Sequence, residues 1–178
     1  TQADTTQNIE GEGGTTPPPT QGPTQEEYDK LACEYIKRHK EGNGFNFFHF
    51  MIDLQGGPCV YKRLSGCGSG TEYLAVTPRG GFYPCHQFVG QEEFLMGNVD
   101  DGIVRKDLQD EFKCCNVYAR EKCNDCFAKF YCSGGCAANA YNFTGKITET
   151  YDIGCEMMRK RVECAIMLKA ARAEAEEN

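Results

Sequence analysis

The sequence lacks the features that would place the protein at a membrane, outside the cell or on a nucleic acid. No apolar run approaches the roughly 20 residues of a bilayer-spanning helix, and the N-terminus has no basic segment followed by an apolar one. Lys and Arg number 19 against 26 Asp and Glu, whereas nucleic-acid-binding domains carry clustered basic residues. We therefore expect a cytoplasmic protein that binds neither membranes nor nucleic acids.

A phosphate-binding P-loop is also absent. The glycine-rich segment at residues 62–70 is not followed by Gly-Lys-Ser/Thr, which that motif requires. Glycine still allows positive φ and lets the backbone come close to a bulky inorganic group. The segment is therefore predicted to be a loop beside such a group.

Cysteine, by contrast, is abundant, with 12 in 178 residues. A disulfide scaffold or a metal site are the two usual reasons. Disulfide-rich domains are usually short and secreted, whereas this chain shows no export signal and its cysteines are closely spaced. The densest stretch, from Cys123 to Cys136, holds four thiols in fourteen residues. These features favour a metal protein.

The chain divides into three parts by composition. Residues 1–24 are rich in Thr, Gln, Gly and Pro and have almost no large apolar side chain, which predicts a disordered linker or tail. Residues 25–58 suggest a helix at 25–41 and an aromatic strand at 45–54, in which His49 is interpreted as a hydrogen-bonded core histidine. Residues 59–178 form the cysteine-rich domain.

The cysteine-rich domain is predicted to be of the α+β class. Strands at 72–77 and 82–88, joined by a Pro-Arg-Gly-Gly turn, predict a β-hairpin that brings Cys67 near Cys85. Irregular loops follow, including one after Phe94. Helices are expected at about 103–112 and 137–142, and the broad apolar face of residues 152–175 predicts a third.

The remaining cysteines differ in their expected roles. Cys155 lies in the first turn of the last predicted helix, where the helix N-terminus favours the thiolate form. Cys33 and Cys164 lie on apolar helix faces and are predicted to be buried core residues. Cys114 and Cys115 are adjacent, so their side chains diverge and are not expected to serve one metal cluster together.

Seven cysteines follow a regular spacing. Cys67 is followed after twelve residues by Gly80 and after four more by Cys85, and the rest read Cys123-x2-Cys126-x5-Cys132-x3-Cys136-x18-Cys155. This pattern resembles the SPASM domain, the auxiliary-cluster module of radical S-adenosylmethionine (SAM) enzymes that modify peptides. Segments 45–54, 62–73 and 83–90 also resemble the maturases that form thioether cross-links in cysteine-rich SCIFF peptides.

The resemblance implies two [4Fe–4S] clusters with interleaved ligands. The first cluster would be held by Cys67, Cys85 and Cys136, and the second by Cys123, Cys126, Cys132 and Cys155. In some relatives an extra upstream cysteine, here Cys59, completes the first cluster. In the thioether maturases one iron is thought to stay open for a substrate thiolate, so both possibilities remain for Cys59.

The SAM-binding triad Cys-x3-Cys-x2-Cys is absent, so this chain cannot start radical chemistry by itself. The resemblance implies that SAM binds an upstream barrel, which residues 25–58 would close or connect to the SPASM module. The barrel would lie in the same polypeptide or a separate chain. A radical made there would take a hydrogen from a precursor peptide, and a cysteine sulfur of the peptide would attack the resulting carbon while an electron leaves through the clusters.

Two other functions remain open at this stage. Cys123, Cys126, Cys132 and Cys136 could form a structural zinc site. The chain could also be a stand-alone electron-transfer or peptide-binding module that acts with a separate radical enzyme.

Overall fold

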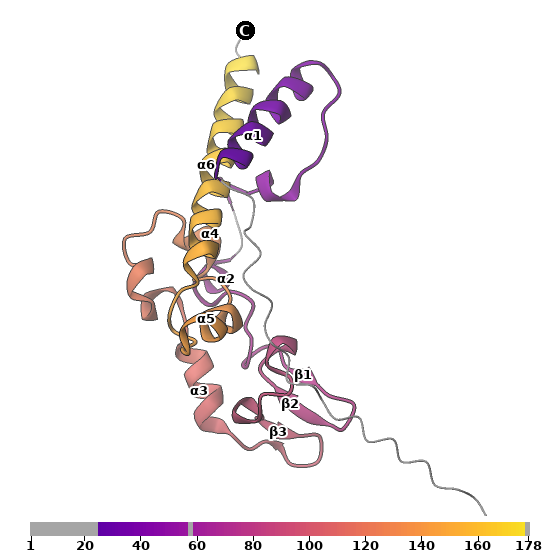
Figure 1. Cartoon of the computed structure of the whole chain (residues 1–178), viewed down its shortest axis with the longest axis vertical. Coiled ribbons are helices and arrows are strands. Elements are labelled where there is room, and N and C mark those ends of the chain that lie inside the picture. Colours follow the sequence, from indigo (N-terminus) through magenta and orange to yellow (C-terminus); the bar gives the residue numbers. More distant parts are fainter. Residues whose placement is uncertain (1–24, 57–58, 177–178) are drawn as a thin grey trace, which may run out of the picture.

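The computed structural model describes residues 25–56 and 59–176 and has an elongated shape (Figure 1). Helices and one small antiparallel sheet are arranged along a long C-terminal helix, so the predicted α+β class is confirmed. The predicted tail at residues 1–24 lies outside the described residues. The elements are α1 (Gln25–Lys40), α2 (Val60–Ser65), β1 (Ala75–Val76), β2 (Gly81–Tyr83), β3 (Gly97–Asn98), β4 (Gly102–Ile103), α3 (Lys106–Cys114), α4 (Lys129–Cys132), α5 (Ala137–Thr144) and α6 (Asp152–Glu176).

The sheet has four short antiparallel strands in the order β1-β2-β3-β4. Ala75 pairs with Tyr83 in the first hairpin, which confirms the prediction with shorter strands. The prediction of a loop after Phe94 missed β3 and β4, because strands of two residues show no alternation of apolar and polar positions. Gly97 shows how close these strands lie: a Cβ there would overlap the carbonyl oxygen of Gly102.

One apolar core lies between the sheet, α3 and α5. Phe88, Phe94 and Phe112 pack against one another in tilted and edge-to-face arrangements, with ring centroids 4.2–6.1 Å apart. Cys85 is buried in this core, and Cys115 and Cys136 pack against it. The predicted site cysteines are thus attached to a rigid body rather than to free loops.

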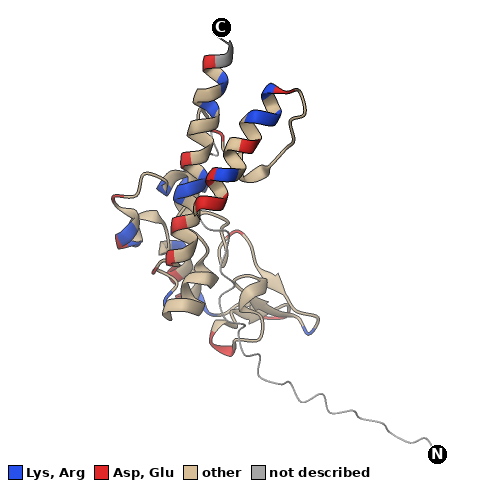
Figure 2. Cartoon of the chain, turned by 45° about the horizontal axis from the view of Figure 1, so that its top comes forward, with Lys and Arg blue, Asp and Glu red and all other residues tan. Residues whose placement is uncertain are grey.

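A second apolar core joins α1 to the C-terminal part of α6. Tyr28, Ala32 and Tyr35 of α1 pack against Cys164 and Leu168 of α6. The two helices run in the same direction, since Tyr28 lies beside Cys164 and Tyr35 beside Arg172. In Figure 2, basic and acidic residues alternate along both helices.

Several predictions about residues 25–70 were wrong. The expected strand at 45–54 contains only a 3-10 turn, η1 (Phe48–Phe50), because its aromatic rings pack on α1 and no described strand lies beside it. Cys33 is exposed rather than buried, because it faces outward from the α1–α6 contact. The first part of the expected glycine-rich loop belongs to α2, which ends at Gly66 with a φ of 70°.

Other expectations are confirmed. Cys164 is buried, and His49 accepts or donates a hydrogen bond of 2.7 Å with the hydroxyl of Tyr28. The helices predicted near 103–112, 137–142 and 152–175 correspond to α3, α5 and α6. Of the helices that the structure describes, none is long and apolar enough to cross a membrane.

Candidate metal centres

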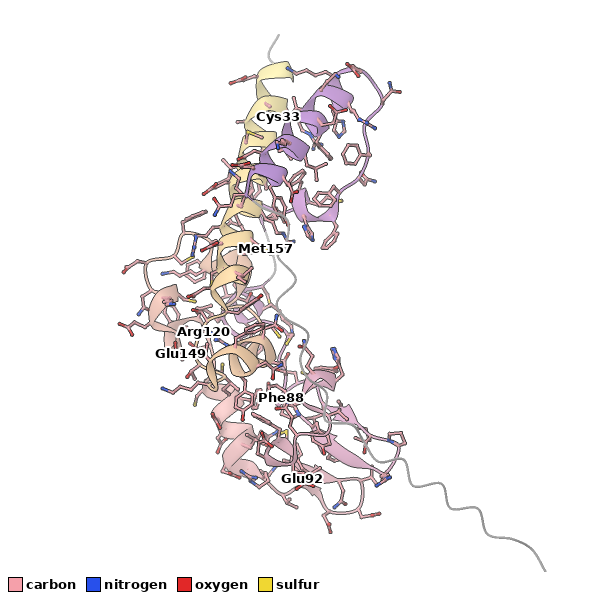
Figure 3. All side chains as sticks on the ribbon, viewed as in Figure 1. Cys33, Phe88, Glu92, Arg120, Glu149 and Met157 are labelled. Atoms are coloured by element: carbon pink, nitrogen blue, oxygen red, sulfur yellow. The ribbon has the colours of Figure 1, made fainter. Side chains whose placement is uncertain are left out.

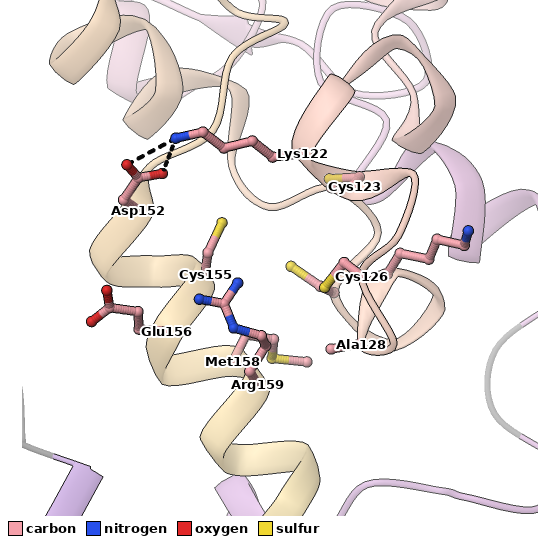
Figure 4. A pocket seen from close by; sticks show the side chains of 12 residues that line it. Lys122, Cys123, Cys126, Ala128, Asp152, Cys155, Glu156, Met158 and Arg159 are labelled. Atoms are coloured by element: carbon pink, nitrogen blue, oxygen red, sulfur yellow. Dashed lines mark hydrogen bonds and ion pairs between the residues drawn. The ribbon is translucent and has the colours of Figure 1, made fainter.

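Four of the predicted ligands surround one cavity. We call Cys123, Cys126, Cys132 and Cys155 the second thiol group; they line a cavity of about 290 Å³ (Figure 4). Each comes from a different local element. Cys123 ends the 3-10 turn η5 (Glu121–Cys123), Cys126 lies in the turn after it, Cys132 ends α4 and Cys155 lies in the first turn of α6.

The wall of this cavity also carries charged side chains. At its edge, Lys122 forms an ion pair of 2.7 Å with Asp152. Glu156 follows Cys155 directly on α6, and Arg159 lies about one turn further on; both line the cavity. In Figure 4 the Arg159 guanidinium lies beside Cys155, whereas the Glu156 carboxylate points away from the sulfurs.

Burial raises the pKa of Cys123, Cys132 and Cys155 and so favours their protonated form when no metal is bound. It raises the pKa of Cys132 to about 11, and the neighbouring Cys155, Cys123 and Cys126 act in the same direction. Burial also raises the pKa of Cys155, so the expected effect of the helix N-terminus does not dominate. Metal binding to this group would therefore release protons.

A sharp turn separates the second group from the next ligand. Ser133, Gly134 and Gly135 all have positive φ, at 58°, 83° and 81°. Among the described residues Ser133 is the one non-glycine with positive φ. This turn directs Cys136 away from Cys132 and starts α5 at the next residue.

Cys136 lies with Cys67 and Cys85, and we call these three the first thiol group. Burial raises the pKa of Cys85, and the nearby Cys136 and Cys67 add to the shift. Gln87 Nε2 lies 3.5 Å from the Cys136 sulfur and donates to it. The structure thus brings together the three residues that the resemblance assigned to one cluster.

For Cys59, the described part of the chain shows no interaction with the first thiol group. Cys59 is exposed and lies directly before α2. Its role as a ligand therefore stays a prediction.

Arg120 was not singled out by sequence reasoning, and Cys115 was considered there only together with Cys114. Arg120 is 3% exposed, and one of its terminal nitrogens donates to the Cys115 sulfur over 3.1 Å. The Cys115 thiol in turn donates to the Ile147 carbonyl over 3.1 Å, and Cys67 is close enough to raise its pKa further. The spacing gave no signal for either residue, and Cys114 beside them is exposed.

The two thiol groups differ from a site for a single metal ion. Within residues 25–56 and 59–176, no three His, Cys, Asp or Glu side chains converge to hold a single metal ion. An iron–sulfur cluster is instead surrounded by its thiolates. The second group, with four thiols around a cavity of about 290 Å³, fits this requirement.

The first group fits it less fully. Its three thiols supply the donor set, but Cys67 alone of the three lines the neighbouring cavity of about 20 Å³, which it shares with Cys115 and Arg120. Cys85 and Cys136 do not line this cavity, so it is not enclosed by the three thiols.

Comparison with known proteins finds sequence similarity over part of the chain. No protein-family model matches the chain. It is 30% identical over 111 residues to an uncharacterized protein of Archaeoglobus fulgidus. The match covers 61% of this chain and 24% of the relative, so the matched region is about a quarter of that protein.

Proposed function

We propose that this chain is an auxiliary iron–sulfur module that holds two [4Fe–4S] clusters. The observation that carries the proposal is the division of seven cysteines into two groups. Cys123, Cys126, Cys132 and Cys155 line one cavity, whereas Cys136, only four positions after Cys132, lies with Cys67 and Cys85. A single zinc site made of Cys123, Cys126, Cys132 and Cys136 does not account for this division.

The enzyme that we propose for the module is a radical SAM maturase that forms thioether cross-links in a cysteine-rich precursor peptide. The resemblance of the cysteine spacing and of segments 45–54, 62–73 and 83–90 supports this choice. SAM would bind a barrel domain upstream or in a separate chain, because this chain lacks the required triad.

The chain's own residues would hold the clusters and present the peptide. When bound, the clusters supply a Lewis-acidic iron for a substrate thiolate and an acceptor for one electron. The first group lies beside Gln87 and near an exposed pair, in which the Tyr73 hydroxyl is 3.3 Å from His86 Nδ1. These polar groups would orient a peptide that approaches the first group. Lys62 is already bound to Glu72 over 2.7 Å, so its charge is partly neutralised.

The test compares two cysteines that are close in sequence but belong to different groups. The 178-residue chain is reconstituted anaerobically with iron and sulfide, and its metal content and electron paramagnetic resonance (EPR) spectrum are measured. The Cys132→Ala variant should lose the second cluster, and the Cys136→Ala variant should lose the first. Each variant should therefore contain about half of the iron of the wild type. Cys33→Ala, an exposed cysteine in α1, is the control and should keep both.

Two results would contradict the proposal. Colourless wild-type protein that contains zinc after anaerobic purification would favour the structural zinc site. Loss of the same EPR signal in Cys132→Ala and Cys136→Ala would show that the two cysteines serve one cluster.

A further inference from the structure

Arg120 is a buried cation without a carboxylate partner. Its side chain is 3% exposed, and no ion pair found in the described part of the chain includes it. It donates to the Glu149 carbonyl oxygen and to the Cys115 sulfur, while its Nε, also buried, has no hydrogen-bond partner among the described residues. Burying an uncompensated charge is costly, so this position calls for a negative group nearby.

The side chain lies where the two thiol groups meet. A Cβ on Gly134 would be 2.9 Å from Arg120 Nε and 3.1 Å from its Cδ, so the arginine packs directly against the middle of the turn between Cys132 and Cys136. Figure 3 shows Arg120 beside Glu149 in the central part of the molecule. The cation therefore contacts the segment that separates a ligand of one group from a ligand of the other.

Both groups lie close to this guanidinium. Gly134, against which Arg120 packs, lines the cavity of the second group together with its four thiols. Arg120 also lines a small cavity together with Cys67 of the first group and with Cys115, whose sulfur it contacts. One guanidinium is thus within electrostatic range of both groups.

We propose that Arg120 is the shared counter-cation of the two thiolate groups, acting on both from the turn at Gly134. This inference rests on the proposed function, since it assumes that both groups carry negative charge when their metal is bound. In this role Arg120 is a positioning residue and not a ligand. It offsets the negative charge of each group and so favours the addition of an electron to either.

The test measures the reduction potentials of both clusters by EPR-monitored titration of the reconstituted 178-residue chain. The two signals are first assigned with Cys132→Ala and Cys136→Ala. Arg120→Gln removes the charge and should move both potentials to more negative values, whereas Arg120→Lys keeps the charge and should leave both near the wild-type values. Arg159→Gln is the matched control: Arg159 lines only the cavity of the second group, so only the second potential should move.

Each result either supports or overturns the role of Arg120 as the shared counter-cation. If Arg120→Gln loads no iron but Arg120→Lys loads both clusters at wild-type potentials, the charge itself is required and the inference holds. It is overturned if Arg120→Gln shifts one potential or none, or if Arg120→Lys fails to load or shifts as Arg120→Gln does. Wild-type protein without iron would instead overturn the proposed function, and the inference with it.

Discussion

The ammonium group of Lys160 lies 2.6 Å from the carboxylate of Asp29 and joins α6 to α1. The Lys160 side chain is only 15% exposed, and its hydrogen bond with Asp29 raises its pKa. The pair lies at the edge of the core formed by Tyr28 and Cys164. It therefore helps to fix the N-terminal segment on the long helix.

Replacing Asp29 should loosen the contact between the two helices. We expect Asp29→Asn to lower the free energy of unfolding by about 1 kcal/mol, because Lys160 is partly buried and loses its carboxylate. Glu34→Gln is the control, since the Glu34–Arg38 pair is exposed within α1 and should contribute less than the Asp29–Lys160 pair. Urea unfolding with Lys160→Met completes a double-mutant cycle; a coupling energy near zero for Asp29 and Lys160 would contradict the expectation.

His49 should make stability depend on pH. Burial and the nearby Arg161 lower its pKa from 6.5, so the folded state binds fewer protons than the unfolded state. The stabilisation is therefore fully present above pH 6.5 and is lost as pH falls through the lower pKa of the folded state. Urea unfolding at several values between about pH 5 and 8 should show a flatter dependence for His49→Gln than for the wild type. Equal slopes would exclude His49 as the cause.

Gly134 and Gly135 offer a matched pair of substitutions. Both have φ near 80°, so alanine at either position should cost on the order of 1 kcal/mol in backbone strain. At Gly135 a Cβ meets nothing within 4 Å, whereas at Gly134 it would press on Arg120. We expect Gly134→Ala to be the more destabilising of the two in thermal unfolding. A smaller effect at Gly134 would mean that Arg120 moves aside easily.

Cys155 and Cys164 lie on the same helix but should behave differently. Cys155→Ser should lose the metal of the second group, because Cys155 lines its cavity. Cys164→Ser should keep both clusters and lose about 1–3 kcal/mol of stability, because a hydroxyl would replace a thiol that is 2% exposed between α1 and α6. Iron content and thermal unfolding of both variants check this; iron loss in Cys164→Ser would place that thiol in a metal site.

The sequence predicted the helices better than the short strands and turns. The apolar faces of α1 and α6 identified these two helices, and α3 and α5 were also expected close to their observed positions. The resemblance to the SPASM pattern implied that Cys136 would lie apart from Cys132. The turn that causes this contains Ser133 in a left-handed conformation, which composition does not reveal.

Other parts of the structure depend on contacts between distant residues. The aromatic segment at 45–54 has strand-like composition but packs its rings on Tyr35 of α1 instead of pairing. Nothing in the sequence distinguishes Arg120 from an exposed basic residue. Its position beside Gly134 and Cys115 follows only from the fold. Burial by distant segments also explains why the pKa of Cys155 rises despite the helix terminus.

The unbroken course of α6 connects the second thiol group to the core that α6 forms with α1. Its first turn holds Cys155, and Leu168, about 20 Å further along the helix, packs in the core with α1. Regions of a protein open in cooperative units, and a continuous hydrogen-bonded helix spans both regions here. If the second group holds a metal as proposed, we expect amide hydrogen exchange in α1 to speed up when that metal is removed, so that the N-terminal helix reports on a site that it does not touch.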